Sequence, residues 1–235
     1  MSATDPDDTT VVTPDEILAL KVASFASMRR NHGESQPEPE PWRVEMEREL
    51  HQGRVRALRA KWNAPQRHVE FDALTKNRWP EWKSVYDSVL DKMGTTGVMI
   101  ALIGERATGK TQLAVEIMKS CTGGLDGRRA MFDTAAGFYR ALQSTFSKAA
   151  TETADMVVRR YREPSLLIID EIGKTSGTTP WEPAQLFELL NLRYGDCKDT
   201  IMTSNQNAEA FTATLGPSLA RRMNETGGII TCNWV

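Results

Sequence analysis

The chain has 235 residues, of which 40% are hydrophobic and 26% charged, and a formal net charge of −2, which leaves room for one full α/β domain and a small appendage. No apolar run is long enough to cross a bilayer and the acidic, polar N-terminus is unlike a signal peptide, so we expect no membrane contact and a cytoplasmic location. Cys121, Cys197 and Cys232 are scattered and odd in number, which argues against a zinc site and against a secreted disulfide framework.

The first 62 residues predict two short helices joined by an extended linker. Thr13-Pro14-Asp15-Glu16 has the pattern of a helix start, with an N-cap, a proline in the first turn and a capping glutamate. Residues 31–41, NHGESQPEPEP, exclude helix and sheet because of their alternating prolines, and a second helix is predicted over 42–62. Two such helices bury little core, so residues 1–62 are predicted to be a helical region that binds a partner.

The second helix carries most of a basic cluster. The cluster is either a solvated helix face, which is favoured, or a local phosphate-contacting surface. Its members are Arg54, Arg56, Arg59, Lys61 and Arg67.

Residues 63–235 predict an α/β domain built on a parallel sheet that is covered on both faces. Five short apolar segments recur along this part of the chain with helical stretches between them, which is the pattern of buried parallel strands. The predicted strands are 98–103, 129–132, 166–169, 200–203 and 229–234.

The clearest motif follows the first of these strands. Gly104-Glu105-Arg106-Ala107-Thr108-Gly109-Lys110-Thr111 fits the P-loop pattern G-x-x-x-x-G-K-[ST] between the strand VMIALI and the helix KTQLAVEIMK. Such a loop turns its backbone N–H groups toward phosphate oxygens, and the positive end of the helix adds to that field. Lys110 would reach the β- and γ-phosphates and Thr111 would hold Mg²⁺, so the sequence predicts an ATP–Mg²⁺ site.

Two further strands end in polar side chains. Leu166-Leu167-Ile168-Ile169 leads to Asp170, which would hold the Mg²⁺ shell, and to Glu171, which would polarise the attacking water. The second acid favours hydrolysis over phosphoryl transfer to a metabolite, which leaves a small-molecule kinase as a weak alternative. Asn205, after the strand over 200–203, could orient the water or touch the γ-phosphate.

Two arginines lie at the end of a predicted helix before the last strand. Arg221 and Arg222 could reach a neighbouring subunit's γ-phosphate, or they could complement the negative end of their own helix. Their position alone leaves the two interpretations even.

The order of these motifs resembles that of AAA+ ATPases, and local segments narrow the likeness to the DnaC/DnaI/IstB group, closest to DnaC-type helicase loaders. The segments are NAPQRHVEFD (63–72), IIDEIG (168–173), LGPSLARRM (215–223) and GGIITCNW (227–234). The resemblance implies a AAA+ core of five parallel strands without a C-terminal helical lid, in which residues 104–111 are Walker A, Asp170 and Glu171 Walker B, and Asn205 sensor 1. It implies an oligomer in which Arg222, or as second choice Arg221, is the arginine finger.

The same resemblance implies an ATPase that loads a ring helicase, contacted through the N-terminal region, onto single-stranded DNA. Phe71 and Asp72 would lie near the adenine. Phe146 and Trp181 fall in segments similar to those that face DNA, where each could stack on a base. The helical spacing of Phe146 from Phe138 and Leu142 favours the core instead, whereas Trp181 is expected to be exposed in a polar loop.

Two other functions fit the same motifs. An IstB-like transposition ATPase would bind duplex DNA and a transposase, and a non-catalytic scaffold would bind ATP without appreciable hydrolysis. Ala107 stands where P-loops often have glycine, which is tolerated if the backbone there keeps an ordinary conformation.

Overall fold

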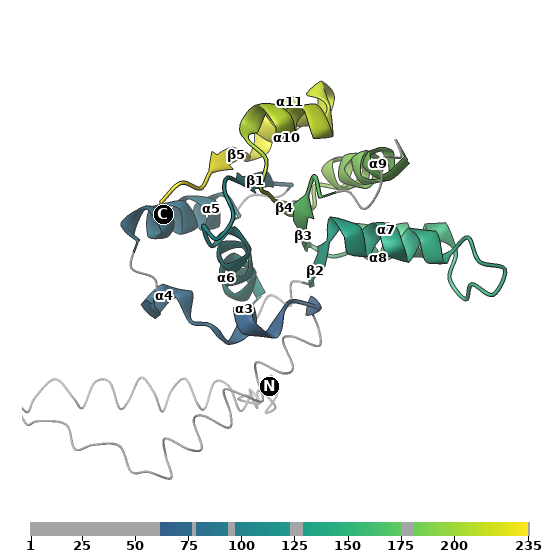
Figure 1. The fold of residues 1–235 in the computed structure, drawn as a ribbon, viewed down its shortest axis with the longest axis horizontal. Coiled ribbons are helices and arrows are strands. Elements are labelled where there is room, and N and C mark those ends of the chain that lie inside the picture. Colours follow the sequence, from purple (N-terminus) through teal and green to yellow (C-terminus); the bar gives the residue numbers. More distant parts are fainter. Residues whose placement is uncertain (1–61, 77–78, 94–96, 123–128, 175–180, 235) are drawn as a thin grey trace, which may run out of the picture. The chain divides into compact units, whose positions relative to one another are not determined.

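Five short strands form one parallel sheet at the centre of the computed structural model, which describes residues 62–76, 79–93, 97–122, 129–174 and 181–234 (Figure 1). The strands lie in the order β2-β3-β4-β1-β5, and every neighbouring pair is parallel. They are β1 (Met99–Ile103), β2 (Ala130–Thr134), β3 (Leu166–Ile172), β4 (Asp199–Ser204) and β5 (Gly228–Thr231). The five predicted strands and the α/β fold class are therefore confirmed, with boundaries that differ by a few residues.

Helices cover both faces of this sheet, as Figure 1 shows. The short helices α3 and α4 precede α5 and α6, and the remaining five follow β2 or later strands. Their bounds are α3 (Gln66–Glu70), α4 (Ala73–Lys76), α5 (Pro80–Lys92), α6 (Lys110–Thr122), α7 (Ala135–Ser144), α8 (Ala154–Arg162), α9 (Trp181–Gly195), α10 (Ala208–Leu215) and α11 (Pro217–Thr226).

The alternation of side chains along β1 separates two hydrophobic cores. Ile100 and Leu102 pack with α5 and α6 on one face, whereas Met99, Ala101 and Ile103 pack with residues of α7 to α11 on the other. Successive residues of a strand point to opposite faces, so a strand that is apolar throughout must be covered twice. This buried position of β1 fixes the point from which the P-loop starts.

A fully buried arginine ties α9 to the strands next to it. Nη1 of Arg193 donates to the carbonyl oxygens of Tyr161 (3.0 Å), Arg162 (2.9 Å) and Pro164 (2.9 Å), which lead into β3. Its Nη2 and Nε donate to Asp199 O and Thr200 Oγ1 at the start of β4. Burial lowers the pKa of Arg193 to about 9, against the opposing influence of nearby carboxylates, so the side chain stays charged at neutral pH.

Most of the predicted N-terminal region lies outside the described residues. This applies to the capping box, to the linker over 31–41 and to the basic cluster up to Lys61. Trp62, the last residue of that region, is fully buried in the core shared with α5 and α6. No helix within the described ranges is long and apolar enough to span a bilayer.

Candidate nucleotide-binding site

The P-loop leaves β1 at Gly104, and any other residue at this position would force the neighbouring backbone to move. Gly104 has φ +136°, and a Cβ on it would lie 2.5 Å from the carbonyl oxygen of Cys232. That segment is held there because Cys232 N donates to Ile103 O at 2.7 Å. Gly109 has φ +77°, and a Cβ on it would meet only Trp82 Nε1, at an ordinary contact distance of 3.9 Å, so its requirement is conformational.

Ala107 adopts a left-handed conformation with φ 67°. The condition under which alanine is tolerated there, an ordinary backbone conformation, is therefore not met. The loop has to curl between Gly104 and Lys110, and the curl places position 107 where glycine is favoured. A non-glycine residue there costs on the order of 1 kcal/mol or more.

The Lys110 ammonium lies within the curl of the loop. Nζ donates to the carbonyl oxygens of Gly104 (3.0 Å) and Glu105 (2.5 Å) and to Thr108 Oγ1 (3.1 Å). Burial lowers the pKa of Lys110, while Cys232 and Asp170 act in the opposite direction. These partners are neutral oxygens, so a phosphate oxyanion would be a stronger acceptor for the same three N–H donors.

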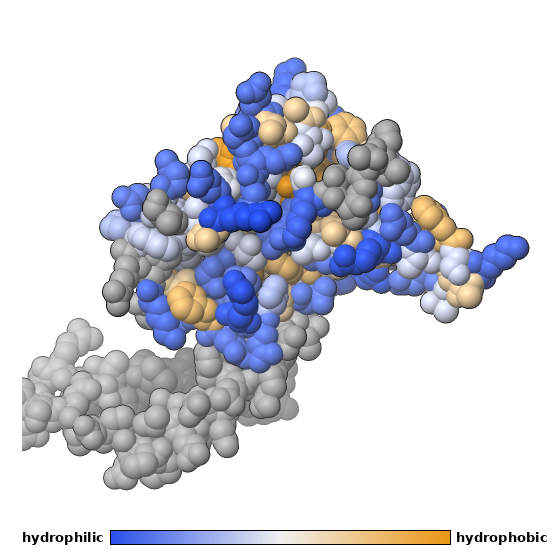
Figure 2. Space-filling model, in the orientation of Figure 1, coloured by the Kyte–Doolittle hydropathy of each residue, from blue (hydrophilic) through white to orange (hydrophobic). Residues whose placement is uncertain are grey.

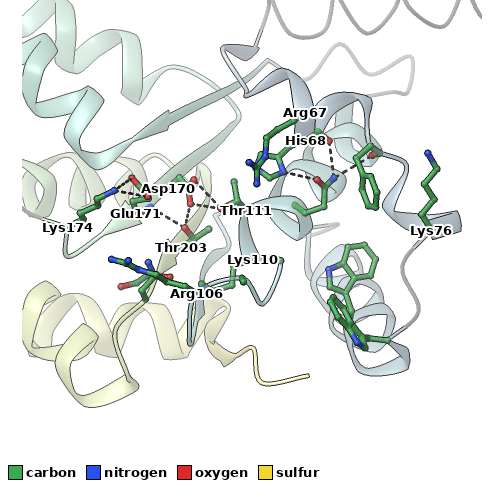
Figure 3. Close-up of a pocket in the computed structure, with 18 residues that line it drawn as sticks. Arg67, His68, Lys76, Arg106, Lys110, Thr111, Asp170, Glu171, Lys174 and Thr203 are labelled. Carbon is green, nitrogen blue, oxygen red and sulfur yellow. Dashed lines mark hydrogen bonds and ion pairs between the residues drawn. The ribbon is translucent and has the colours of Figure 1, made fainter. Parts of the chain in front are cut away.

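Asp170 joins the P-loop helix to β3 and β4. Its carboxylate oxygens accept from the hydroxyl of Thr111 at 3.1 and 3.2 Å, and Oδ1 also accepts from the hydroxyl of Thr203. Figure 3 shows these three side chains converging on one point. A hydroxyl and a carboxylate are the hard oxygen ligands that Mg²⁺ prefers, so this pair fits the ion.

Glu171 follows in a strained turn at the end of β3. Its φ is 60° and its N–H donates to Thr203 Oγ1 at 3.2 Å. Its carboxylate forms an ion pair with Lys174, a residue outside the sequence motifs. No periodicity or motif marks Lys174, because its position depends on how the turn folds.

These residues line one cavity of about 980 Å³. Lys110, Thr111, Asp170, Glu171 and Asn205 meet in its wall, together with Arg106, Ala107 and Gly109 of the loop. Asn205 is exposed and directly follows β4. The structure thus brings the P-loop and the ends of β3 and β4 together, as expected when parallel strands end at one edge of a sheet.

An aromatic and basic wall forms another side of the cavity. Phe71, expected near the adenine, is one of its members and is 40% exposed. Trp79, which is exposed, and Trp82, whose buried indole N–H finds no partner among the described residues, were not predicted. The members are Arg67, His68, Phe71, Lys76, Trp79 and Trp82.

A side chain of α6 fastens this wall to the P-loop helix. Gln112 directly follows Thr111, and its Oε1 lies 2.8 Å from His68 Nδ1 while its Nε2 donates to His68 O at 2.9 Å. Further along the same helix, Lys119 Nζ donates to Phe71 O at 3.0 Å. The two sides of the cavity are therefore held at a fixed spacing.

Comparison with known proteins agrees with this geometry. A model of the family described as IstB-like ATP binding protein matches residues 90–223, which is more than half of the chain. The chain belongs to this family. Its predicted place in the DnaC/DnaI/IstB group is thereby confirmed, and the family is an ATP-binding one. No curated protein matches the sequence.

Solved structures share the fold of this IstB-like protein. The DnaC helicase loader matches with a TM-score of 0.62 and 16% identity, over 72% of this chain and 100% of that chain. DnaI matches with a TM-score of 0.58 and 14% identity, over 73% and 96%. The replication initiator DnaA bound to AMPPCP and single-stranded DNA matches with a TM-score of 0.54 and 21% identity, over 66% of this chain but only 46% of that chain.

The two candidate finger arginines lie on α11, outside the wall of the cavity. Arg222 is half-buried, donates to Asn191 Oδ1, and has its guanidinium 5.1 Å from the ring centroid of Tyr194. Arg221 is exposed and pairs with Glu225 at 3.2 Å on the same helix. Neither lines the nucleotide cavity of its own chain.

Phe146 is exposed in this IstB-like protein, so its expected place in the core is wrong. The helix that carries the buried Phe138 and Leu142 ends at Ser144, and the spacing of four residues loses its meaning beyond that point. Phe146 is 66% exposed, and its ring meets that of the half-buried Trp181 edge to face, 5.5 Å between centroids. Figure 2 shows apolar side chains near the outer ends of α7 and α8 amid a mostly hydrophilic surface.

Proposed function

We propose that this protein is a cytoplasmic, ATP-hydrolysing loader of a ring-shaped replicative helicase, acting in the initiation of DNA replication. In this proposal several copies assemble with ATP, residues 1–62 bind the helicase, and the copies hold single-stranded DNA. The observation that carries the proposal is the meeting of the P-loop, Asp170, Glu171 and Asn205 at one cavity. A fold that covers the whole length of the DnaC helicase loader supports the loader role.

The chain's own residues would divide the work on the nucleotide. Lys110 would exchange its three oxygen partners for the β- and γ-phosphates. Phe71 and the neighbouring tryptophans offer an apolar wall for the base. Glu171 would polarise the attacking water and Asn205 would orient it, since both border the cavity beside Asp170.

Thr111 and Asp170 would hold Mg²⁺. Their hydroxyl and carboxylate oxygens are already within hydrogen-bond distance of each other. When bound, the ion would neutralise charge on the β- and γ-phosphates.

Hydrolysis would be completed in trans by Arg222. The side chain does not reach the cavity of its own chain, so a monomer would turn over slowly. A guanidinium supplied by a neighbour stabilises charge in the transition state and is worth about 10³-fold or more in related phosphoryl transfers.

The catalytic part is tested with Glu171→Gln. Turnover of ATP should fall about 100-fold or more, because a positioned base contributes on that order, while ATP binding is retained. Unchanged turnover would instead support the scaffold that binds ATP without using this carboxylate.

The assembly part is tested by mixing two inactive variants. Arg222→Ala lacks the finger and Glu171→Gln lacks the base, so only a mixture contains a site with both groups intact. Restored turnover in the mixture supports action in trans, and a mixture as inactive as its components speaks against it. Arg221→Ala in the same assay decides between the two arginines.

The match to the IstB-like family favours a second candidate, a transposition ATPase that binds duplex DNA and a transposase. The two candidates differ in partner and in strand number. Pull-down with a ring helicase against a transposase, and fluorescence anisotropy with single-stranded against duplex DNA, separate them. Capture of the transposase together with a preference for duplex DNA would overturn the loader proposal.

A further inference from the structure

Gln112 of the P-loop helix fixes which nitrogen of the His68 ring carries a hydrogen. Gln112 Nε2 donates to the carbonyl oxygens of His68 (2.9 Å) and Phe71 (3.5 Å), so the amide oxygen Oε1 is the atom that lies 2.8 Å from His68 Nδ1. An amide oxygen only accepts, and Nδ1 must therefore be the donor. In the neutral ring the other nitrogen, Nε2, then has a lone pair and no hydrogen, so it is an acceptor.

This acceptor belongs to the wall of the nucleotide cavity. His68 is half-buried and lines the cavity. Its Nδ1 is taken up by Gln112 of α6, and Nε2 forms no hydrogen bond within the part of the chain that the structure describes. Nε2 is therefore the polar atom of this side chain that is available to a ligand in the cavity.

The position of His68 corresponds to the base end of a bound nucleotide. Figure 3 shows Thr111 between Asp170 on one side and His68 on the other. With the phosphates and Mg²⁺ at Thr111 and Asp170, the base extends toward the opposite wall, where Phe71 offers an exposed ring. The amide of Gln112 holds the backbones of His68 and Phe71 next to each other, so a base that stacks on Phe71 lies beside His68.

We propose that Nε2 of His68 accepts a hydrogen bond from the 6-amino group of adenine, and that this contact makes the site prefer ATP to GTP. Guanine carries an oxygen acceptor at the same position, so it would leave both acceptors unpaired. The inference rests on the proposed function and deepens it, because it assigns the side chain that distinguishes the base. A ribose hydroxyl could donate to the same atom, so the test includes a nucleotide that differs from ATP only in the base.

His68→Asn removes Nε2, while the amide nitrogen of asparagine takes the place of Nδ1 and can keep the bond to Gln112. The full-length protein is titrated with ATP, GTP and purine riboside triphosphate, which lacks the 6-amino group, in competition with a ribose-labelled fluorescent ATP analogue. The wild type should bind ATP about tenfold or more tightly than GTP, and about three- to tenfold more tightly than purine riboside triphosphate.

In His68→Asn the affinity for ATP should fall about three- to tenfold, and the affinity for purine riboside triphosphate should stay as in the wild type. The variant and the analogue each remove one partner of the same bond, so their effects should not add. Gln66→Ala changes an exposed residue of the same helix outside the cavity wall, and should keep the wild-type affinities.

Two results would overturn the inference. One is an equal loss of affinity for ATP and for purine riboside triphosphate in His68→Asn, which would show that the side chain contacts the ribose or only supports the wall. The other is a wild type that binds GTP as tightly as ATP. Either result, with Glu171→Gln inactive in hydrolysis, leaves the proposed function intact, whereas a wild type that binds none of the three nucleotides would overturn the proposed function itself.

Gln112→Leu tests how the hydrogen is placed on the ring. Without the amide oxygen the neutral imidazole can carry its hydrogen on either nitrogen, and a ring with the hydrogen on Nε2 can donate to the oxygen of guanine. The ratio of the ATP affinity to the GTP affinity should therefore fall about threefold or more. An unchanged ratio would overturn the orienting role of Gln112.

Discussion

The indole N–H of Trp234 donates to the carbonyl oxygen of Thr108 at 2.8 Å, which links the C-terminal segment to the middle of the P-loop. Both residues are buried. The bond turns a carbonyl of the loop away from the cavity, and a P-loop binds phosphate only when its N–H groups face inward. We therefore expect Trp234 to position the P-loop for phosphate binding.

Trp234→Phe should weaken ATP binding about three- to tenfold. The smaller phenyl ring fills most of the place of the indole, but the Thr108 carbonyl loses its donor. A buried unpaired acceptor costs about 1–3 kcal/mol, which a rearranged loop can partly recover. Titration with a fluorescent ATP analogue measures the affinity.

Tyr161→Phe is the matched control for Trp234→Phe. It removes another side-chain hydrogen bond, from the Tyr161 hydroxyl to Asp133 Oδ2 at 2.5 Å, away from the cavity. It should lower stability without changing ATP affinity. Equal ATP affinities of the two variants would argue against a positioning role for Trp234.

Ala107→Gly should stabilise the protein by up to about 1 kcal/mol. Glycine relieves the left-handed strain at φ 67°, although it also gains freedom in the unfolded chain, so the net change is modest. Urea unfolding followed by circular dichroism measures the difference. Ala208→Gly, at the exposed start of α10, is the control and should not stabilise the protein. A similar loss of unfolding free energy in both variants would contradict backbone strain at Ala107.

Arg193→Met should destabilise the fold by about 3–5 kcal/mol, enough to unfold a marginal domain. Four carbonyl oxygens and the Thr200 hydroxyl lose their donor in a region that water does not reach. Arg193→Lys keeps the charge but lacks the planar fork, so it should also be strongly destabilised.

Chemical denaturation of both Arg193 variants is compared with that of Arg159→Met. Arg159 forms an exposed ion pair with Glu163, and its loss should leave the unfolding midpoint nearly unchanged. A near-normal midpoint for Arg193→Lys would show that charge, and not the geometry of the fork, is what the site requires.

The sheet and the meeting of the motifs could be predicted because both depend on local patterns. A buried parallel strand is a short apolar run, and a P-loop is defined by its own eight residues. Parallel strands that end at one edge then bring Asp170 and Asn205 to the loop without further information.

The features that could not be predicted depend on where the backbone turns. The sequence spacing placed Phe146 on a buried stripe because nothing in it marks the end of α7 at Ser144. The left-handed backbone at Ala107 and the pairing of Lys174 with Glu171 follow from the geometry of two turns. The bond between Trp234 and Thr108 joins positions far apart in the chain, which no local pattern records.

Phe146 and Trp181 should bind single-stranded DNA as one aromatic unit. Their rings touch edge to face although they come from different elements, and Phe146 leaves most of its ring open to a stacking base. Stacking of a base on an aromatic side chain is worth about 1–3 kcal/mol, so Phe146→Ala should weaken binding of an oligonucleotide about fivefold or more. Trp181→Ala should have a similar effect, and the double variant should lose less than the sum because each ring supports the other.

Fluorescence anisotropy with a labelled oligonucleotide measures these affinities, in the presence of ATP, with which we propose that the copies assemble. Phe187→Ala, another exposed aromatic on α9, is the matched control and should bind DNA like the wild type. Since stacking tolerates any base, the loss should be the same for different sequences. Strictly additive losses of affinity would show that the two rings bind DNA independently. A normal affinity of Phe146→Ala would contradict DNA binding by this pair and favour a contact with a protein instead.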